Sequence, residues 1–193
     1  MNPAEQKAAL RAAALARRAA VNLQAREAFA GRLAAQGVDL ARKAQARVVS
    51  AYWPMGDEAD VSWLVHALAY HDFTAALPCV IARGHPLVFR RWTSRDPLVP
   101  AGFGTQEPSA RLPEVVPDVV FTPLAAFDRR GYRIGYGGGY YDLTLASLRR
   151  MKPILAIGVA YSVQEIEAAP IEPHDQKLDL VLTESELIDC GTD

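Results

Sequence analysis

The sequence predicts an α/β fold: a single domain with a mostly parallel sheet flanked by helices. Short apolar runs of strand length alternate with longer segments of helical composition, which is the pattern of parallel strands joined by helical crossovers. The chain has 193 residues, a length at which one domain with a substantial core is expected. We therefore assign residues 1–193 to one domain.

The first half of the chain begins with helix and then alternates strand and helix. Residues 3–36 are rich in Ala, Leu, Arg and Glu and predict one or two helices, with Asn2 as cap and Pro3 at the first helical position. A buried strand, a loop, an amphipathic helix and a second strand follow at residues 48–53, 54–60, 61–70 and 73–80.

The second half predicts a further strand, a loop-rich insertion and then more strand–helix alternation. Strands are expected at residues 86–92, 119–122, 154–159 and 178–183. The insertion is expected at 97–117, a helix at 140–150 and a short helix at 164–168.

Three polar loops each follow a predicted strand: residues 53–58, 127–142 and 162–179. In open α/β sheets ligands bind at the carboxyl ends of the strands. We therefore expect these loops to converge on one crevice.

Charge and cysteine content exclude several classes of protein. The net charge is −1, from 21 basic and 22 acidic residues, so no global attraction to nucleic acid or to an anionic membrane is expected. The first residues lack the apolar core of a signal peptide, and no apolar run reaches the length of a membrane span. Cys79 and Cys190 form no CxxC pair and fit reduced thiols in a cytoplasmic protein.

The segment from Phe127 to Asp142, FDRRGYRIGYGGGYYD, carries five glycines within nine residues. Successive backbone N–H groups in such a loop form an anion-binding nest, and the predicted helix after it adds a positive dipole end. An acid beside a phosphate cradle is a common way to hold Mg²⁺. The segment predicts a nucleotide triphosphate site, with a tight structural turn as the alternative.

Known phosphate-loop patterns do not match this segment. A P-loop needs Gly-Lys-Ser/Thr, and no lysine lies between Arg111 and Lys152. The dinucleotide pattern G-x-G-x-x-G also fails, since its third glycine would fall at Tyr140 or Asp142.

The segment resembles the signature of the 5-formyltetrahydrofolate cyclo-ligase family. Four other stretches agree in the same order: Lys7-Ala-Ala-Leu-Arg11, Trp53-Pro-Met-Gly-Asp-Glu58, Gly102-Phe-Gly-Thr-Gln-Glu-Pro108 and His174-Asp-Gln-Lys-Leu-Asp179. The resemblance covers nearly the whole chain. It implies ATP-dependent cyclisation of 5-formyltetrahydrofolate to 5,10-methenyltetrahydrofolate, with Mg²⁺, on a fold like that of sugar-phosphate isomerases and coenzyme A transferases. Its implied partners are small molecules, in a monomer or weak dimer.

The resemblance places the nucleotide on the N-terminal helix and the glycine segment. Lys7 and Arg11 are four residues apart and share a helix face, for which solvation is the alternative explanation. Lys7 and Arg133 are the implied catalytic residues, and Arg11 joins them as an ATP contact. The other implied ATP contacts are Ile134, Gly135, Tyr136, Gly137, Gly138, Gly139, Tyr140 and Tyr141. Family members often carry a basic residue where this chain has Tyr136 or Gly138, so Lys7, Arg11 and Arg133 would have to suffice with the metal.

Two acids are implied for the metal, Asp142 and Asp175, and Mg²⁺ needs no more than one or two carboxylates. Without the resemblance, Asp142 would be a helix N-terminal acid. Asp179 is expected to be structural, and His174 has no metal-ligand spacing to another histidine.

The resemblance implies that Glu58 binds the reduced pterin, because a carboxylate accepts two hydrogen bonds from an aminopyrimidine edge. A polar turn is the alternative. Trp53 and Met55 would be apolar walls and Tyr140 would line the same pocket. The stretch 102–108, with Phe103 and Glu107, is a candidate lid.

Two rival functions stay open. An isomerase or transferase on the same scaffold would need a base or acyl-accepting glutamate, for which Glu107 and Glu114 are candidates. A folate- or nucleotide-binding protein would keep the pocket without turnover. Release of ADP in the presence of folate separates the cyclo-ligase from an isomerase or transferase, and tight ligand binding without product would favour the binding protein.

Overall fold

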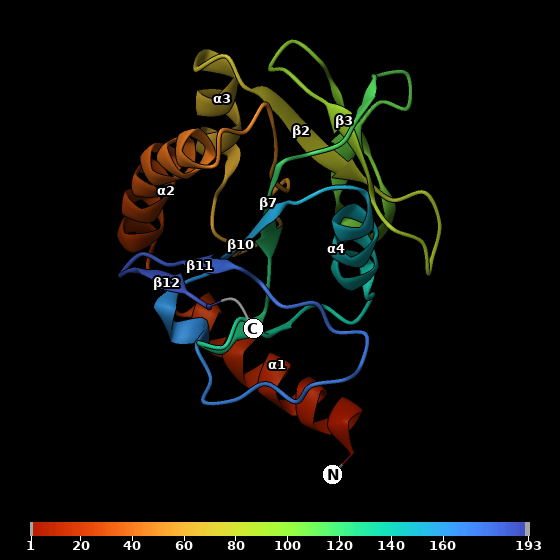
Figure 1. Ribbon diagram of the computed structural model, residues 1–193. Helices are drawn as coiled ribbons and strands as arrows, with labels where there is room; N and C mark the ends of the chain where they lie inside the picture. Colours follow the sequence, from red (N-terminus) through yellow and green to blue (C-terminus); the bar gives the residue numbers. More distant parts are fainter. Residues whose placement is uncertain (1, 192–193) are drawn as a thin grey trace.

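The computed structural model describes residues 2–191 and contains one large sheet between layers of helix (Figure 1). Its eight strands run in the order β12-β11-β10-β7-β1-β2-β3-β6. The five central strands, from β11 to β2, are parallel, and the strands outside them pair antiparallel. The predicted α/β fold with a mostly parallel sheet is confirmed.

The strands of this sheet are short, and the central ones carry apolar residues to both faces. They are β1 (Val48–Ser50), β2 (Thr74–Cys79), β3 (Val88–Arg91), β6 (Glu114–Val115), β7 (Val119–Pro123), β10 (Leu155–Val159), β11 (Leu180–Leu182) and β12 (Leu187–Asp189). In β7, Val119 and Phe121 belong to one core cluster and Val120 to another, because successive side chains of a strand point to opposite faces.

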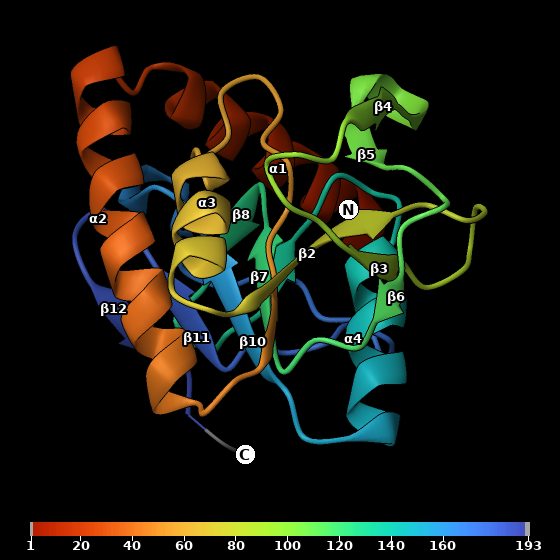
Figure 2. The same cartoon turned by 90° about the horizontal axis from the view of Figure 1, so that it is seen from above.

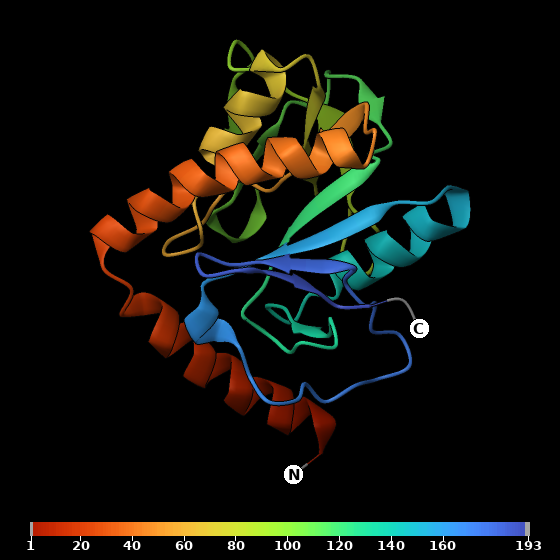
Figure 3. The same cartoon turned by 60° about the vertical axis from the view of Figure 1, so that its left-hand side comes forward.

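Helices cover both faces of the sheet, as Figure 3 shows. On one face α2 (Leu23–Lys43) packs against α3 (Ser62–Tyr70), and on the other lies α4 (Tyr140–Met151). The predicted helix at 3–36 is two helices, since α1 (Pro3–Ala19) precedes α2. Asn2 caps α1 through a capping box with Glu5, as its position before Pro3 predicts.

The second helix runs to Lys43, past the predicted end at residue 36. Gly37 is buried, and a Cβ there would lie 2.6 Å from Leu64 Cδ1. This glycine marks the close approach of α3 to α2, not the end of the helix. Such packing cannot be read from the local sequence.

Helix α1 lies apart from the main sheet, against the small hairpin of β8 (Ala126–Phe127) and β9 (Arg133–Ile134). Ala14 packs there with Ala126 and Ile134. This contact brings the N-terminal helix beside the glycine segment.

The predicted short helix at 164–168 is wrong. The structure has a 3₁₀ turn, η2 (Ser162–Gln164), after which Glu165 forms a parallel bridge with Phe127. The buried Gln164 amide donates to the carbonyls of Leu124 and Ala125, at 2.9 and 3.0 Å. These tertiary hydrogen bonds hold the segment extended where its composition favours helix.

The loop-rich insertion at 97–117 contains a second hairpin, β4 (Leu98–Pro100) and β5 (Gln106–Pro108), joined through the 3₁₀ turn η1 (Gly102–Gly104). Figure 2 shows this hairpin beyond the end of the large sheet. Glu107 Oε2 accepts a hydrogen bond from the Val80 N–H at 3.1 Å, which ties the hairpin to the end of β2. The Phe103 side chain lies outside the described part of the structure.

Both cysteines are free and buried, and burial raises the pKa of each thiol to about 11. Within the described residues, no helix is both long and apolar enough to cross a membrane.

We expect Cys79 and Cys190 to resist alkylation in the folded protein. With a pKa near 11, roughly one thiol in a thousand is ionised at pH 8, and the thiolate is the nucleophile. Iodoacetamide at pH 8 should label both at least about 100-fold more slowly than in urea, as measured by peptide mass spectrometry. Rapid labelling of either cysteine in the folded protein would contradict this prediction.

Candidate active site

A cavity of about 260 Å³ opens at the carboxyl ends of the central strands. Its walls come from the loop after β1, the ends of β2 and β7, the β4–β5 hairpin and the glycine segment. Two of the three polar loops predicted to converge here therefore line it. The third, residues 162–179, reaches the site through its contacts with Arg133 and Asp142.

The glycine segment forms a strand, a loop and a helix start. After β9 the chain turns through residues 135–139, and α4 begins at Tyr140, as predicted. Gly139 is the residue before the helix and has φ 66°, a left-handed conformation that favours glycine. Gly139 has no side chain with which to cap this helix, and among residues 2–191 no other side chain caps it, so its first N–H groups have no side-chain partner there.

Arg133 is the buried centre of the site. Its side chain is 4% exposed, and it donates to the Gln176 carbonyl at 2.6 Å and to Asp142 Oδ1 at 2.9 Å. The N–H of Gln176 donates to the same Asp142 oxygen at 3.0 Å. Burial lowers the pKa of Arg133, and the charge of Asp142 opposes that effect. Arg133 and Asp142 together line the cavity.

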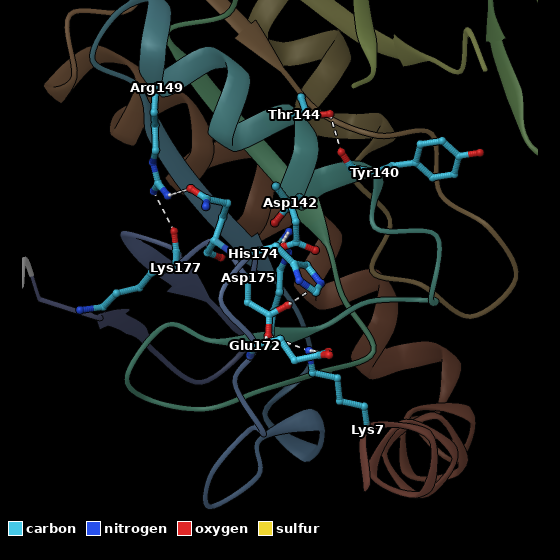
Figure 4. Close-up of polar contacts among 12 residues, drawn as sticks. Lys7, Tyr140, Asp142, Thr144, Arg149, Glu172, His174, Asp175 and Lys177 are labelled. Carbon is cyan, nitrogen blue, oxygen red and sulfur yellow. Dashed lines mark hydrogen bonds and ion pairs between the residues drawn. The ribbon is translucent and has the colours of Figure 1, made fainter. Parts of the chain in front are cut away.

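Lys7 reaches the same region from α1. Its Nζ lies 2.6 Å from Asp175 Oδ2 and 2.7 Å from Glu172 Oε2, as Figure 4 shows. Burial lowers the pKa of Lys7, but the hydrogen bonds to these two carboxylates outweigh burial and leave the pKa above its ordinary value. Lys7 is therefore a charged group held at the edge of the site by two acids, of which sequence reasoning missed Glu172.

Arg11 follows Lys7 on the same helix face and donates from Nε to the Gly135 carbonyl at 2.6 Å. The predicted pairing of Lys7 and Arg11 on one face holds, and the face is turned to the glycine segment rather than to solvent. In the folded chain Arg11 fixes the loop itself.

At the other end of the cavity Glu58 lines the wall and is 7% exposed. Its Oε1 accepts from the Tyr136 hydroxyl at 2.5 Å and its Oε2 from the Met55 N–H at 2.9 Å. Burial raises the pKa of Glu58, although the hydrogen bonds from Tyr136 and Met55 and the charge of Arg18 oppose part of that rise.

Arg18 is a residue of the site that sequence reasoning missed. Its NH1 donates to the Tyr136 hydroxyl at 2.5 Å, and its NH2 is paired with Asp57. A signal for it exists in the sequence, because Lys7, Arg11 and Arg18 follow the spacing i, i+4, i+11 of one helix face.

Aromatic and apolar side chains form the rest of the wall. Trp53 and Met55 line the cavity, and the Trp53 ring lies 5.6 Å from that of Trp92. Tyr140 and Tyr141 also line it, and burial raises the pKa of Tyr141. In Figure 4 the Tyr140 ring points away from the cluster formed by Asp142, Asp175 and Lys7.

The loop residues Gly135, Tyr136, Gly138 and Gly139 line the cavity as well. Ile134 is buried in the core cluster that supports α1. Gly137 has φ 97° and lies next to the Arg11 guanidinium, which would be 3.8 Å from a Cβ at that position.

The two glutamates considered for a transferase differ in position. Glu114 lies on β6, is paired with Arg90 and does not line the cavity. Glu107 lines the cavity but is bonded to the Val80 N–H. The arrangement does not favour an acyl-accepting glutamate.

Asp142 and Asp175, the two acids predicted to bind a metal, each have one carboxylate oxygen that could coordinate Mg²⁺. Asp142 uses Oδ1 for Arg133 and Gln176, and Asp175 uses Oδ2 for Lys7 and the Glu172 N–H. Among the described residues, the other oxygen of each acid accepts no hydrogen bond, and the only contact of those two oxygens is an ion pair of Asp175 Oδ1 with His174 at 3.8 Å. One or two carboxylate oxygens with phosphate and water is the usual ligand set of this ion.

Comparisons with known proteins identify the family of this chain. The model of the 5-formyltetrahydrofolate cyclo-ligase family matches residues 3–184. A 5-formyltetrahydrofolate cyclo-ligase of Mycolicibacterium smegmatis is 34% identical and aligns over 95% of both chains. The Haemophilus influenzae protein of that name is 33% identical, over 73% of this chain and 78% of its own.

Solved structures give the same result. The 5,10-methenyltetrahydrofolate synthetase of Aquifex aeolicus superposes with a TM-score of 0.80 at 27% identity, covering 97% of this chain and 94% of that one. The fold, the cavity with its glycine segment and these relatives lead to one conclusion: the chain belongs to the 5-formyltetrahydrofolate cyclo-ligase family of enzymes.

Proposed function

We propose that this chain carries out the reaction of its family, the ATP-dependent cyclisation of 5-formyltetrahydrofolate to 5,10-methenyltetrahydrofolate, with the residue roles below. The observation that supports this proposal is a single cavity with two chemically different ends. One end holds the cationic and acidic groups of the glycine segment, and the other holds Glu58 between apolar and aromatic walls.

The nucleotide end would bind the triphosphate. Lys7 and Arg133 place a movable point charge and a planar fork beside the loop N–H groups, which suits phosphate oxygens. Arg11 stabilises the loop through the Gly135 carbonyl. Binding of ATP would draw Lys7 from Glu172 and Asp175 toward the phosphates, since its Nζ has three donors on a flexible stem.

Asp142 and Asp175 would hold Mg²⁺ through their second oxygens, directly or through water. The bound ion would neutralise part of the charge of the phosphates. Release of Lys7 by Asp175 on nucleotide binding would leave that carboxylate with more of its oxygens for the ion.

The folate end would bind the reduced pterin. Each carboxylate oxygen has two lone-pair sites. Glu58 uses one on each oxygen for Tyr136 and Met55, so the remaining sites can accept from an aminopyrimidine edge. Trp53, Met55 and Tyr140 would be the apolar walls around the ring.

In the reaction the formyl oxygen attacks the γ-phosphorus, and ADP leaves. N10 then attacks the activated formyl carbon, and phosphate leaves as the ring closes with loss of the N10 proton. The substrate supplies the nucleophile, so the site needs no serine or cysteine triad. The residues orient two substrates and screen the charge between an oxygen nucleophile and a polyphosphate.

The direct test follows the near-ultraviolet absorbance of the methenyl product. Purified protein is mixed with 5-formyltetrahydrofolate, with MgATP, or with both. Product that appears only with both, matched by ADP release, supports the proposal. Folate binding without product would favour a binding protein instead. We further propose a monomer or weak dimer that acts in the cytoplasm on small molecules.

We expect Lys7→Ala to raise the KM for MgATP by about 10–100-fold, the loss of one hydrogen bond to a charged group. The KM for folate should change much less. Lys152→Ala is the matched control, because Lys152 forms a comparable pair with Asp118 at 2.6 Å, outside the cavity. Steady-state kinetics with each substrate varied measures both constants. An unchanged KM for MgATP would remove Lys7 from the nucleotide site.

A further inference from the structure

The last turn of α1 directs the Arg18 side chain away from solvent, toward Tyr136 and Asp57 beside the folate end of the cavity. Its side chain is 7% exposed, although arginine at the end of a surface helix normally keeps its guanidinium in water. Arg17, its neighbour, takes the expected course: it is exposed and donates to the Val163 carbonyl. The two residues therefore have different roles on one helix.

Arg18 and Glu58 are connected through a single hydroxyl. Arg18 NH1 donates to the Tyr136 oxygen at 2.5 Å, and the same oxygen lies 2.5 Å from Glu58 Oε1. A guanidinium can only donate, so the Tyr136 oxygen accepts from Arg18 and directs its own proton to Glu58. This direction makes Glu58 Oε1 an acceptor, the role that an ionised carboxylate fills with both of its oxygens.

The arrangement carries a cost that packing alone does not explain. The Arg18 Nε is buried and has no hydrogen-bond partner in the described part of the chain, and a buried unpaired donor is unfavourable. The guanidinium also lies 5.8 Å from the centre of the Tyr136 ring, so Arg18 contacts both the face and the hydroxyl of that tyrosine. Tyr136 is 44% exposed, and Arg18 and Glu58 both bond to its hydroxyl, so Arg18 helps to hold the ring in place.

We propose that Arg18 is a positioning residue for folate recognition, which fixes the Tyr136 hydroxyl as a donor to Glu58 and so holds that carboxylate charged and oriented at the cavity wall. The inference rests on the proposed role of Glu58 in binding the pterin. Positions 136 and 138 of the loop carry no basic side chain, since they are Tyr136 and Gly138. Arg18 brings a cation to this loop from α1.

The proposal has a consequence for the pH dependence of folate binding. The groups that face Glu58 are Tyr136, Arg18, Asp57, Tyr52 and Tyr141. Among them only Arg18 is a cation, and its loss raises the pKa of Glu58 further above its ordinary value. A protonated Glu58 offers fewer acceptor sites for the pterin. As the solution is acidified, an Arg18 variant should therefore lose its affinity for folate at a higher pH than the wild type does.

The test is calorimetric titration of the full chain with 5-formyltetrahydrofolate in the absence of ATP. Arg18→Met keeps the length of the side chain, Tyr136→Phe keeps the ring, and Arg17→Met is the matched control. Each of the first two should weaken binding about ten-fold, and the double variant should be no weaker than the weaker single variant. Arg18→Lys should recover part of the affinity, and the KM for MgATP should stay within about two-fold of wild type in both Arg18 variants.

A folded Arg18→Met protein that binds folate with wild-type affinity and the wild-type pH dependence would overturn the proposal. It would also be overturned if the affinity losses of the two single variants multiply in the double variant. A rise in the KM for MgATP as large as the loss of folate affinity in Arg18→Met would overturn it as well. If Arg18→Met does not fold, Tyr136→Phe is the deciding variant, because the Tyr136 hydroxyl links Arg18 to Glu58. Unchanged folate affinity in Tyr136→Phe refutes the proposal.

Glu58→Gln separates this inference from the proposed function. Wild-type affinity in Glu58→Gln removes the role of Glu58 and this inference with it, whereas weak binding there beside normal binding in Arg18→Met overturns this inference only.

Discussion

Replacing Arg133 by alanine is expected to lower turnover by about 10³-fold or more, the low end of what a well-placed arginine contributes to phosphoryl transfer. The buried guanidinium is aimed by the Gln176 carbonyl and Asp142, so its remaining donors are already oriented when the nucleotide arrives. This preorganisation is the reason that a large effect on rate is expected.

The same burial means that Arg133→Ala should also cost stability, by about 3 kcal/mol, since removing one partner of a buried pair leaves the other charge uncompensated. The loss of turnover, about 4 kcal/mol in activation free energy, should be the larger effect. Turnover at saturating substrate, measured well below the melting temperature of the variant, separates the two.

Arg149→Ala is the control for this prediction. Arg149 ties α4 to the same segment, through the Lys177 carbonyl at 2.7 Å and Gln176 Oε1 at 3.3 Å, but it does not line the cavity. It should lower the melting temperature and leave turnover within a few-fold of wild type. Wild-type-like turnover in a folded Arg133→Ala protein would refute the role of Arg133.

Replacing Asp142 by asparagine is expected to raise the Mg²⁺ concentration for half-maximal activity by about 100-fold or more. Even an outer-shell partner of a metal contributes about 10–100-fold in affinity, and a direct ligand should contribute at least as much. The asparagine oxygen can still accept from Arg133 and from the Gln176 N–H, but the buried Arg133 loses its counter-charge, so the melting temperature should also fall. A titration of activity with Mg²⁺ at fixed ATP measures the effect.

Asp179→Asn is the matched control for Asp142→Asn. Asp179 also pairs with an arginine, Arg149, and accepts from the Ala156 N–H at 2.6 Å, but it lies outside the cavity. This variant should lose stability without a change in its requirement for Mg²⁺. If Asp142→Asn needs no more Mg²⁺ than wild type, Asp142 is not a metal ligand and its part in the site is to hold Arg133.

The predictions that succeeded depend on local chemistry. The start of α1 follows from Asn2 and Pro3, and the start of α4 follows from a glycine run ahead of an amphipathic segment. The parallel sheet follows from apolar runs that alternate with helices. The position of the cavity follows from the same pattern, because the carboxyl ends of parallel strands lie at one edge of a sheet.

The predictions that failed involve contacts between distant residues. The segment 164–168 has helical composition, yet the buried Gln164 amide bonds to the β7–β8 connection and holds it in another conformation. The end of α2 was predicted too early, at residue 36, whereas Gly37 is a point of contact with Leu64 on α3 and the helix continues past it.

The sequence by itself determined the family, the order of the elements and the residues of the glycine segment, because each of these is a matter of residue type and spacing along the chain. Only the tertiary structure decided which charges meet. Lys7 pairs with Asp175 across 168 residues and Arg18 with Tyr136 across 118, distances over which spacing carries no information. Those pairs form because α1 packs on the β8–β9 hairpin through Ala14, and that packing sets how far each side chain reaches into the site.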